Sequence, residues 1–409
     1  MTIRLSQLMT WLHTWIGLLS GWLLFAVFLT GTLTVFDQEI TSWMQPELHE
    51  VTSDQGRMSS TAPWPARLIS QPRLENPNVS TGRSLLHMVK LQENRTFSGQ
   101  TFDPVTGRLV TFRDTQGGDF FYHFHYGLLF GWPGAWMVAG AAIMMLITLF
   151  TGVVSHRWQI KDIVMLRLRP SHPRVWLDTH NLTGILFIPF HLMMAVSGLV
   201  IFWSMYMPVN VTLLRDQDGK GIVSLFSLVH FAQFGGSPVR WLYFLMGLAA
   251  TVMIATGLVL WIGTRQKSQA DLSRRAGYRL VEVFTVAVVA GLPVAVAAFF
   301  WANRLLPLAL YERSLWEVRC FFLVWGLCLL HSSLRRGSIL AWRDQLYAAA
   351  FLLGCLPLLN GLTTNTHLLI SIPREQWEFV GVDLTGLVLG GTLGWIGRLI
   401  EQRPLKELP

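Results

Sequence analysis

Long apolar runs, separated by short polar loops, dominate the chain. An α-helix needs about 20 predominantly apolar residues to cross the hydrocarbon core of a bilayer. We place the predicted spans at 8–36, 133–156, 179–206, 239–262, 280–301, 316–334, 343–362 and 379–398. The pattern therefore predicts an all-α polytopic membrane protein with about eight transmembrane helices.

Composition and charge agree with this class. Hydrophobic residues make up 52% of the chain and charged residues only 14%, a balance that is unusual for a water-soluble globule. The formal net charge of +8 does not indicate nucleic acid, because the basic residues lie in short loops beside the apolar runs. We expect membrane lipid as the surroundings of the chain and no nucleic-acid partner.

The basic loops also predict the orientation. Arginine and lysine concentrate after the second, fourth and sixth spans, in 157–174, 265–279 and 335–336. These loops should face the cytoplasm, and both termini with them. The first apolar run follows Arg4 but lacks a small-x-small cleavage site, so we expect an uncleaved first span rather than a signal peptide.

One large segment, 37–120, should lie outside the cytoplasm between the first two spans. Within it, Gly99–Phe112 is typical of a β-hairpin, because Asp103-Pro104-Val105-Thr106-Gly107 supplies turn residues between β-prone flanks. A small β-rich cap is therefore expected, with a shorter hairpin at 215–221. The predicted organisation is 1–36 (first helix), 37–120 (outer segment), 121–178 (second helix and its loop), 179–262 (third and fourth helices) and 263–409 (four additional spans).

Two motifs each occur twice. The first occurs as His13-x3-Gly17 with Thr30-Gly31, and again at the same offsets as His180-x3-Gly184 with Ser197-Gly198. The second occurs as His125-x7-Pro133-x2-Trp136-x14-Thr151-Gly152 and, without a gap, as His230-x7-Pro238-x2-Trp241-x14-Thr256-Gly257. Residues 8–158 and 179–262 are therefore interpreted as two parallel copies of a helix pair, related by an axis along the membrane normal.

The repeat pairs four histidines, His13 with His180 and His125 with His230. A two-fold axis would bring each pair to the centre of a four-helix bundle from opposite sides, as two axial imidazoles around one flat haem require. The three cysteines form no Cys-x-x-Cys-His motif, so covalent c-type haem is not indicated. The hypothesis is two b-type haems stacked across the membrane, each with its iron between two histidines.

Four glycines fit this hypothesis. Eighteen residues make five helical turns, so Gly31 points the same way as His13, and Gly198 the same way as His180. By depth, Gly152 and Gly257 fall level with the His13/His180 pair. Gly31 and Gly198 fall level with the His125/His230 pair. Each layer would thus combine two histidines with two haem-packing glycines.

A simpler interpretation is that interfacial histidines anchor the helices and the glycines serve helix packing. The symmetric pairing of four histidines favours cofactor ligation over this alternative. Three further histidines are weaker candidates. His191 lies mid-span, where it could line a haem edge, relay protons or replace a predicted ligand. His123 lies two residues from His125, and His156 could extend to the membrane boundary.

The two layers could be far apart, since eighteen helical residues span about 27 Å. However, the stretches 130–134 and 234–238 contain glycine and proline and should break the helices next to the outer histidines. Such breaks could fold His125 and His230 inward and shorten the distance between the two histidine layers.

The His-x3-Gly first span ending in Thr30-Gly31, the outer Asp-Pro-x-Thr-Gly-Arg sequence, His125-Tyr126-Gly127 and Asp178-Thr179-His180 together resemble the PepSY-associated transmembrane-helix family. The resemblance covers roughly residues 8–262. It implies an inner-membrane protein of a bacterium, similar to ferrisiderophore reductases with haem b in the membrane and a PepSY-like periplasmic cap. The loop at about 207–229 is too short for a second full module of this kind, and the last four spans lie outside the pattern.

The leading hypothesis is electron transfer from the cytoplasmic side, through two haems, to a periplasmic ferric siderophore, whose iron is released once ferrous. No Gly-x-Gly-x-x-Gly follows a predicted strand, so the donor should be quinol or another electron-donor protein. No residue is assigned a catalytic role. The alternatives are a siderophore, haem or peptide permease without redox chemistry, since parallel repeats and broken spans also occur in transporters, or an assembly subunit that binds a periplasmic partner.

Overall fold

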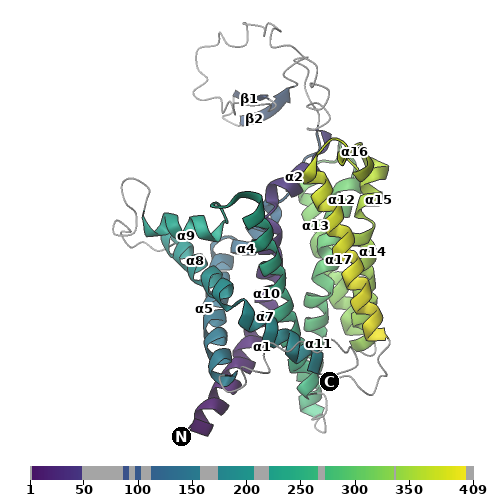
Figure 1. The fold of residues 1–409 in the computed structure, drawn as a ribbon. Coiled ribbons are helices and arrows are strands. Elements are labelled where there is room, and N and C mark those ends of the chain that lie inside the picture. The colour runs from purple at the N-terminus through teal and green to yellow at the C-terminus, as the bar shows by residue number, and fades with distance from the viewer. Residues whose placement is uncertain are drawn as a thin grey trace.

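The computed structural model describes residues 2–47, 86–91, 97–102, 112–156, 174–206, 221–265, 272–335 and 338–401. In these residues, eight helical stretches are long and apolar enough to cross a membrane. This confirms the predicted multi-pass, largely helical architecture. Figure 1 shows that α1 begins and α17 ends at the same end of the bundle. We call this end the proximal side and the opposite end the distal side.

The first half of the bundle contains the two copies of the repeat. The first copy comprises α1 (Thr2–Thr34), α4 (Asp119–Gly127) and α5 (Gly131–His156). The second comprises α7 (Arg174–Leu186), α8 (Ile188–Tyr206), α9 (Ile222–His230) and α10 (Gly236–Arg265). Helix α1 packs against α5 and α10, α7 packs against α10, and α5 packs against α8, so the two copies form one bundle.

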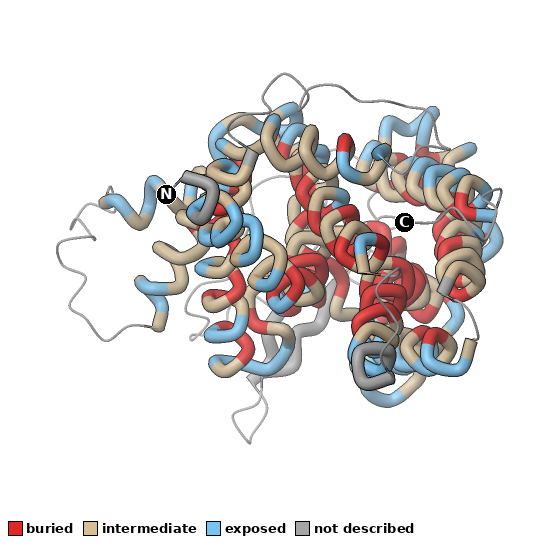
Figure 2. Tube along the Cα trace, turned by 90° about the horizontal axis from the view of Figure 1, so that it is seen from below, coloured by how far each residue is buried: buried red, intermediate tan, exposed pale blue. Residues whose placement is uncertain are grey.

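The second half is a separate group of helices beside this bundle (Figure 1). It consists of α11 (Leu272–Val289), α12 (Gly291–Leu305), α13 (Arg313–Leu334), α14 (Ser338–Gly354), α15 (Leu356–Thr363), α16 (Leu368–Ser371) and α17 (Trp377–Glu401). Seen from below, the buried positions of both halves turn inward and the exposed ones outward (Figure 2). We call this second half the C-terminal unit.

Three predicted spans are not single helices. Span 179–206 is divided between α7 and α8, span 280–301 between α11 and α12, and span 343–362 between α14 and α15. Each new helix carries a proline in its first turn: Pro189, Pro293 and Pro357. Proline lacks an N–H and its ring clashes with the preceding turn, but it is tolerated where a helix starts. The prolines therefore account for all three breaks.

Short helices turn back at the distal ends of α5 and α10. Helix α4 ends four residues before Gly131 and α9 ends six residues before Gly236, and these two repeat-equivalent glycines adopt φ of 61° and 60°. Such left-handed conformations favour glycine because it has no Cβ. The predicted breaks at 130–134 and 234–238 are therefore confirmed, and they make α4 and α9 separate helices rather than extensions of the spans.

The outer segment contributes three described elements. Helix α2 (Asp37–Met44) follows α1, and β1 (Leu86–Leu91) pairs antiparallel with β2 (Phe97–Phe102) so that Leu86 faces Phe102. The first strand of the predicted hairpin Gly99–Phe112 pairs instead with Leu86–Leu91. The observed hairpin therefore lies earlier in the sequence than the predicted one. Residues 103–111 and 207–220, including most of the second predicted hairpin, lie outside the described residues.

Aromatic side chains join the two halves of the bundle. Phe120 of α4 stacks on Phe299 of α12 with ring centroids 4.5 Å apart, and its ring also lies 4.9 Å from that of Phe321 in α13. Phe124 and Phe121 of α4 extend the same core. Helix α4 is thus held between the repeat bundle and the C-terminal unit.

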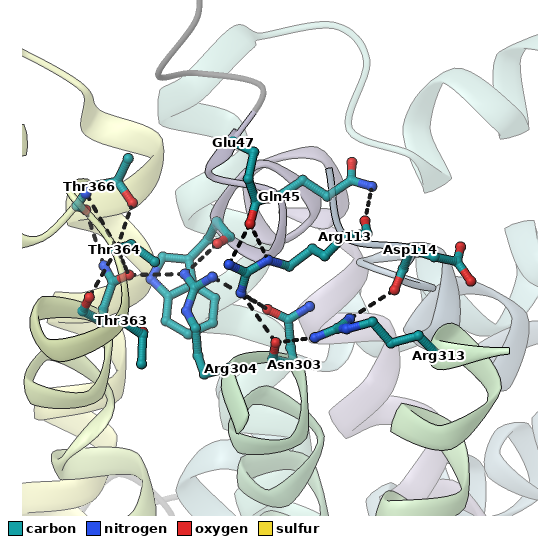
Figure 3. Close-up of polar contacts among 12 residues, drawn as sticks. Gln45, Glu47, Arg113, Asp114, Asn303, Arg304, Arg313, Thr363, Thr364 and Thr366 are labelled. Atoms are coloured by element: carbon teal, nitrogen blue, oxygen red, sulfur yellow. Dashed lines mark hydrogen bonds and ion pairs between the residues drawn. The ribbon is translucent and has the colours of Figure 1, made fainter. Parts of the chain in front are cut away.

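A buried polar cluster also joins the halves at the distal side (Figure 3). Arg113 donates from Nε to Glu47 Oε1 at 2.7 Å and from Nη1 to the Asn303 carbonyl at 3.2 Å. Because Glu47 follows α2 and Arg113 precedes α4, this contact joins two distant parts of the outer segment to α12. We call this cluster, with the residues of the next paragraph, the distal network.

The distal network continues into the C-terminal unit through paired charges. Arg313 and Glu317 form an ion pair with 2.5 Å between Nη1 and Oε1, and Glu317 also accepts from Asn303. Arg304 lies 3.9 Å above the Trp43 ring, and Trp43 donates to Asp383 at 2.9 Å. Buried charges are costly unless they are paired, so these interactions explain how the unit tolerates them.

Candidate functional site

Two histidines from the two repeat copies meet on the proximal side. His13 of α1 and His180 of α7 have ring centroids 6.1 Å apart, with ring planes at 70°. His13 donates from Nδ1 to the Thr148 carbonyl of α5 at 2.9 Å, and His180 donates to the Met253 carbonyl of α10 at 2.8 Å. Thr148 and Met253 are equivalent in the repeat, so this layer keeps its symmetry.

The proximal pair lines a cavity of about 570 Å³, which is within the size range of cofactor sites. Its walls combine apolar side chains with Gly17, Gly21 and Gly184. Gly17 and Gly184, which follow the two histidines in the sequence motif, thus line this space, whereas Gly21 also lets Leu258 of α10 approach α1 closely.

The other two histidines meet on the distal side. His125 of α4 and His230 of α9 have ring centroids 6.3 Å apart, with ring planes at 38°. His125 donates from Nδ1 to the Val27 carbonyl at 2.8 Å. The Ser197 hydroxyl donates to the Met193 carbonyl at 2.6 Å and can accept from His230 Nδ1 at 2.8 Å.

These hydrogen bonds assign the tautomer of the rings. A carbonyl oxygen can only accept, so Nδ1 carries the proton in His13, His180 and His125, and Nε2 is the basic nitrogen. Second-shell acceptors of this kind orient an imidazole and raise its basicity toward a metal. Helices α4 and α9 belong to none of the eight spans. Burial lowers the pKa of His125 and lowers that of His230 to about 3, which favours the neutral form of each ring.

Each predicted glycine lies against one of the histidine rings. A Cβ added at Gly152 would lie 3.1 Å from His13 Cε1, and one at Gly257 would lie 3.0 Å from His180 Cε1. At Gly31 it would lie 2.5 Å from His125 Nδ1, and at Gly198 it would lie 3.4 Å from His230 Cε1. The arrangement is the one expected from the repeat, with two histidines and two glycines in each layer.

The ring separations fit coordination of one metal ion by each pair. With a metal–nitrogen distance of about 2.0 Å and roughly 1.1 Å from nitrogen to ring centre, two imidazoles on opposite sides of an ion have centroids about 6 Å apart. The observed 6.1 and 6.3 Å agree with this value. In the described parts of the chain no three His, Cys, Asp or Glu side chains cluster as a metal site, whereas haem iron needs only two axial ligands from protein.

The His125 ring lies beside the end of α1 that follows Val27. Val27, which accepts from His125, follows His13 by fourteen residues, or about 21 Å of helix. The ring also lies against Gly31, whose separation from His13 is about 27 Å along the helix. A shortened distance between the layers therefore stays a prediction.

The weaker candidates lie outside both pairs. His191 is fully buried in α8 and its ring lies edge-on to Phe28 and Phe190, at 6.4 and 6.2 Å. His123 is exposed and pairs with the Tyr126 hydroxyl at 3.0 Å. His156 is the last residue of α5, and its side chain lies outside the described part of the chain.

Sequence reasoning missed the acceptors that hold the rings. Thr148, Met253 and Val27 act through main-chain carbonyls, which leave no trace in side-chain patterns. Ser197 does carry a signal, because it directly precedes Gly198 in the repeated motif and its counterpart in the first copy is Thr30. The small polar residue before the glycine could have been read as a hydrogen-bonding partner.

Comparisons with known proteins agree with these features. A model of the PepSY-associated TM region matches residues 10–221 and 215–263, which include both histidine pairs. The chain is also 30% identical over 171 residues to a Pseudomonas aeruginosa protein described as "Uncharacterized protein PA4219". That match spans 40% of this chain and 40% of the relative. With a match that covers both copies of the helix-pair repeat, the chain belongs to the family of the PepSY-associated TM region.

Proposed function

We propose that the protein is a bacterial inner-membrane reductase that binds two b-type haems and transfers electrons across the membrane to a ferric siderophore. The observation that carries this proposal is the pair of facing imidazoles in each layer, with centroid separations suited to a shared metal ion. His13 and His180 would hold one haem, and His125 and His230 the other. A haem with two imidazole ligands supplies reversible one-electron transfer.

The residues around each pair support this role. The carbonyls of Thr148, Met253 and Val27 fix the rings so that Nε2 can act as ligand. The four glycines leave space beside the rings, and the proximal cavity is walled by apolar side chains. A dry site of this kind keeps water away from a redox centre and affects its potential.

The direction of transfer follows from the predicted topology. The proximal side carries both termini and, by the positive-inside rule, would face the cytoplasm. A quinol or a donor protein would supply electrons there, and the predicted β-rich PepSY-like cap on the distal side would hold the ferric chelate. One electron converts each ferric ion to ferrous, and the hard oxygen ligands of a siderophore hold ferrous iron less tightly.

The haem assignment is tested by absorption spectroscopy. We expect the purified protein to show a haem b spectrum in the dithionite-reduced minus oxidised difference, with two haems per chain. His13→Ala and His125→Ala should each remove one haem, because each deletes one of two axial ligands. The exposed His123 provides the matched control, and His123→Ala should retain both haems.

The reductase assignment is tested in proteoliposomes that contain the full chain. Reduced protein should convert an external ferric siderophore to the ferrous state, detected with a ferrous-specific chelator, and both histidine variants should lose this activity. A protein that binds no haem, or a spectrum unchanged in both variants, would contradict the proposal. Siderophore uptake by haem-free proteoliposomes would instead support the permease alternative.

A further inference from the structure

The proximal cavity has a polar rim next to its apolar interior. In the described residues that line the cavity, Arg265 carries the one permanent charge. Together with Thr10 and Thr14, Arg265 also lines a second hollow of about 320 Å³ at the beginning of α1. The guanidinium thus lies where the cavity opens toward the proximal surface.

Two tryptophan rings hold this guanidinium. Its Cζ lies 4.3 Å from the Trp261 ring and 5.4 Å from the Trp15 ring, which are distances suited to cation–π contact. Arg265 Nη1 donates to Thr264 Oγ1 at 3.4 Å. None of the ion pairs among described residues joins Arg265 to a carboxylate. The guanidinium is therefore positioned and retains N–H groups for an anion.

Trp261 supports the guanidinium from the cavity wall. Its side chain lines the cavity and is only 8% exposed. The indole N–H has almost no accessible surface, so it does not face the open space, and the ring face is the part that meets Arg265. Arg265 therefore supplies the charged contact of this rim that a ligand can reach.

We propose that Arg265, held by Trp261 and Trp15, binds the propionate carboxylates of the haem that His13 and His180 would hold. This inference rests on the proposed function and adds the orientation of the cofactor. Protohaem carries two carboxylates on one edge of an otherwise apolar ring, and Arg265 offers the cavity's permanent positive charge. Arg265 would therefore hold the carboxylate edge at the cavity rim, on the side where an electron donor would approach.

The test compares protohaem with its dimethyl ester, in which both carboxylates are blocked. Full-length protein prepared without haem is titrated with each compound, and binding is followed by absorbance. The background variant His125→Ala/His230→Ala leaves the proximal pair as the only predicted site, and the same titrations of the protein with both pairs provide a second measurement. We expect protohaem to bind about tenfold to a hundredfold more tightly than the ester, as hydrogen bonds to a charged group predict.

Arg265→Gln should remove most of this difference by weakening protohaem alone. Trp261→Phe keeps an aromatic ring beside the guanidinium but weakens the cation–π contact, and should cause a smaller loss that is again confined to protohaem. Arg174→Gln is the control, because Arg174 is exposed at the start of α7 and lies outside the cavity lining. It should leave both affinities unchanged.

Equal weakening of both compounds by Arg265→Gln would overturn the proposal, because a structural role or a bound lipid phosphate would act on both alike. An unchanged ratio of the two affinities would overturn it as well. Failure of the proposed function gives a different result, since the protein with both histidine pairs would then bind neither compound.

Discussion

In the proximal layer both histidine rings donate to main-chain carbonyls at equivalent positions of the repeat, whereas the distal layer pairs one ring with a carbonyl and the other with a hydroxyl. The glycine clearances differ in the same way: 3.1 and 3.0 Å at Gly152 and Gly257, but 2.5 and 3.4 Å at Gly31 and Gly198. One duplicated sequence thus produces a symmetric site on one side of the membrane and an asymmetric one on the other.

The supports of the distal histidines explain part of this difference. Helix α4, which carries His125, has four buried residues and packs against the C-terminal unit through Phe120 and Phe124. The residues of helix α9, which carries His230, are all half-buried or exposed along its described length. Helix α11 of the C-terminal unit packs against both copies of the repeat, through α1 and α10. At the distal side, however, the unit holds α4 through aromatic contacts, and this support breaks a symmetry that the duplication alone would preserve.

The largest expected effect comes from removing that support. Phe299 is fully buried and stacks on Phe120, so Phe299→Ala should destabilise the protein by about 3 kcal/mol through lost packing. Haem content should fall at the distal site before the proximal one. Thermal unfolding and haem per chain measure the two effects.

Phe351 provides the control for this variant, because it belongs to the C-terminal unit but its side chain is 63% exposed. Phe351→Ala should leave both measurements near those of the unmodified protein. Equal loss from both sites in Phe299→Ala would show that the C-terminal unit does not support the distal layer selectively.

An intermediate effect is expected from Gly31→Ala. The added methyl group would meet the His125 ring at 2.5 Å and displace it from the Val27 carbonyl, and such overpacking costs about 1–3 kcal/mol. We expect at least tenfold weaker haem binding at the distal site, measured by titration. Gly198→Ala is the matched control, since 3.4 Å is nearly ordinary contact. Similar affinities in the two variants would contradict the asymmetry of the layer.

The smallest effect is expected from Ser197→Ala. It removes the acceptor of His230 Nδ1 and makes the imidazole less basic, which should favour ferrous iron. A hydrogen bond of about 0.5–1.5 kcal/mol corresponds to a distal potential raised by about 20–60 mV, measurable by redox titration. Thr30 is the equivalent residue and donates only within its own helix, so Thr30→Ala should cause no shift. A lowered potential in Ser197→Ala would refute the assigned role of the hydroxyl.

The meeting of the histidines could be predicted because a repeat relates positions that lie far apart in the sequence. Helical phase predicts that Gly31 shares the face of His13, and depth in the membrane predicts that Gly152 lies level with the proximal pair. The acceptor carbonyls could not be predicted, since every residue has one. The distal network could not be predicted, because its residue pairs, such as Arg113 with Asn303, are far apart in the sequence and lie outside the repeat. Arg265 belongs to a loop whose basic residues predict the orientation, and its place at the cavity rim depends on the fold.

The histidine hydrogen bonds have a further consequence for biogenesis. They join α1 to α5 and α7 to α10 on the proximal side, and α4 to α1 and α9 to α8 on the distal side. Every one of them uses Nδ1, the nitrogen that iron would not need. The helices can therefore be inserted and brought into register by contacts that do not depend on a cofactor, which allows newly made protein to await loading in a folded state.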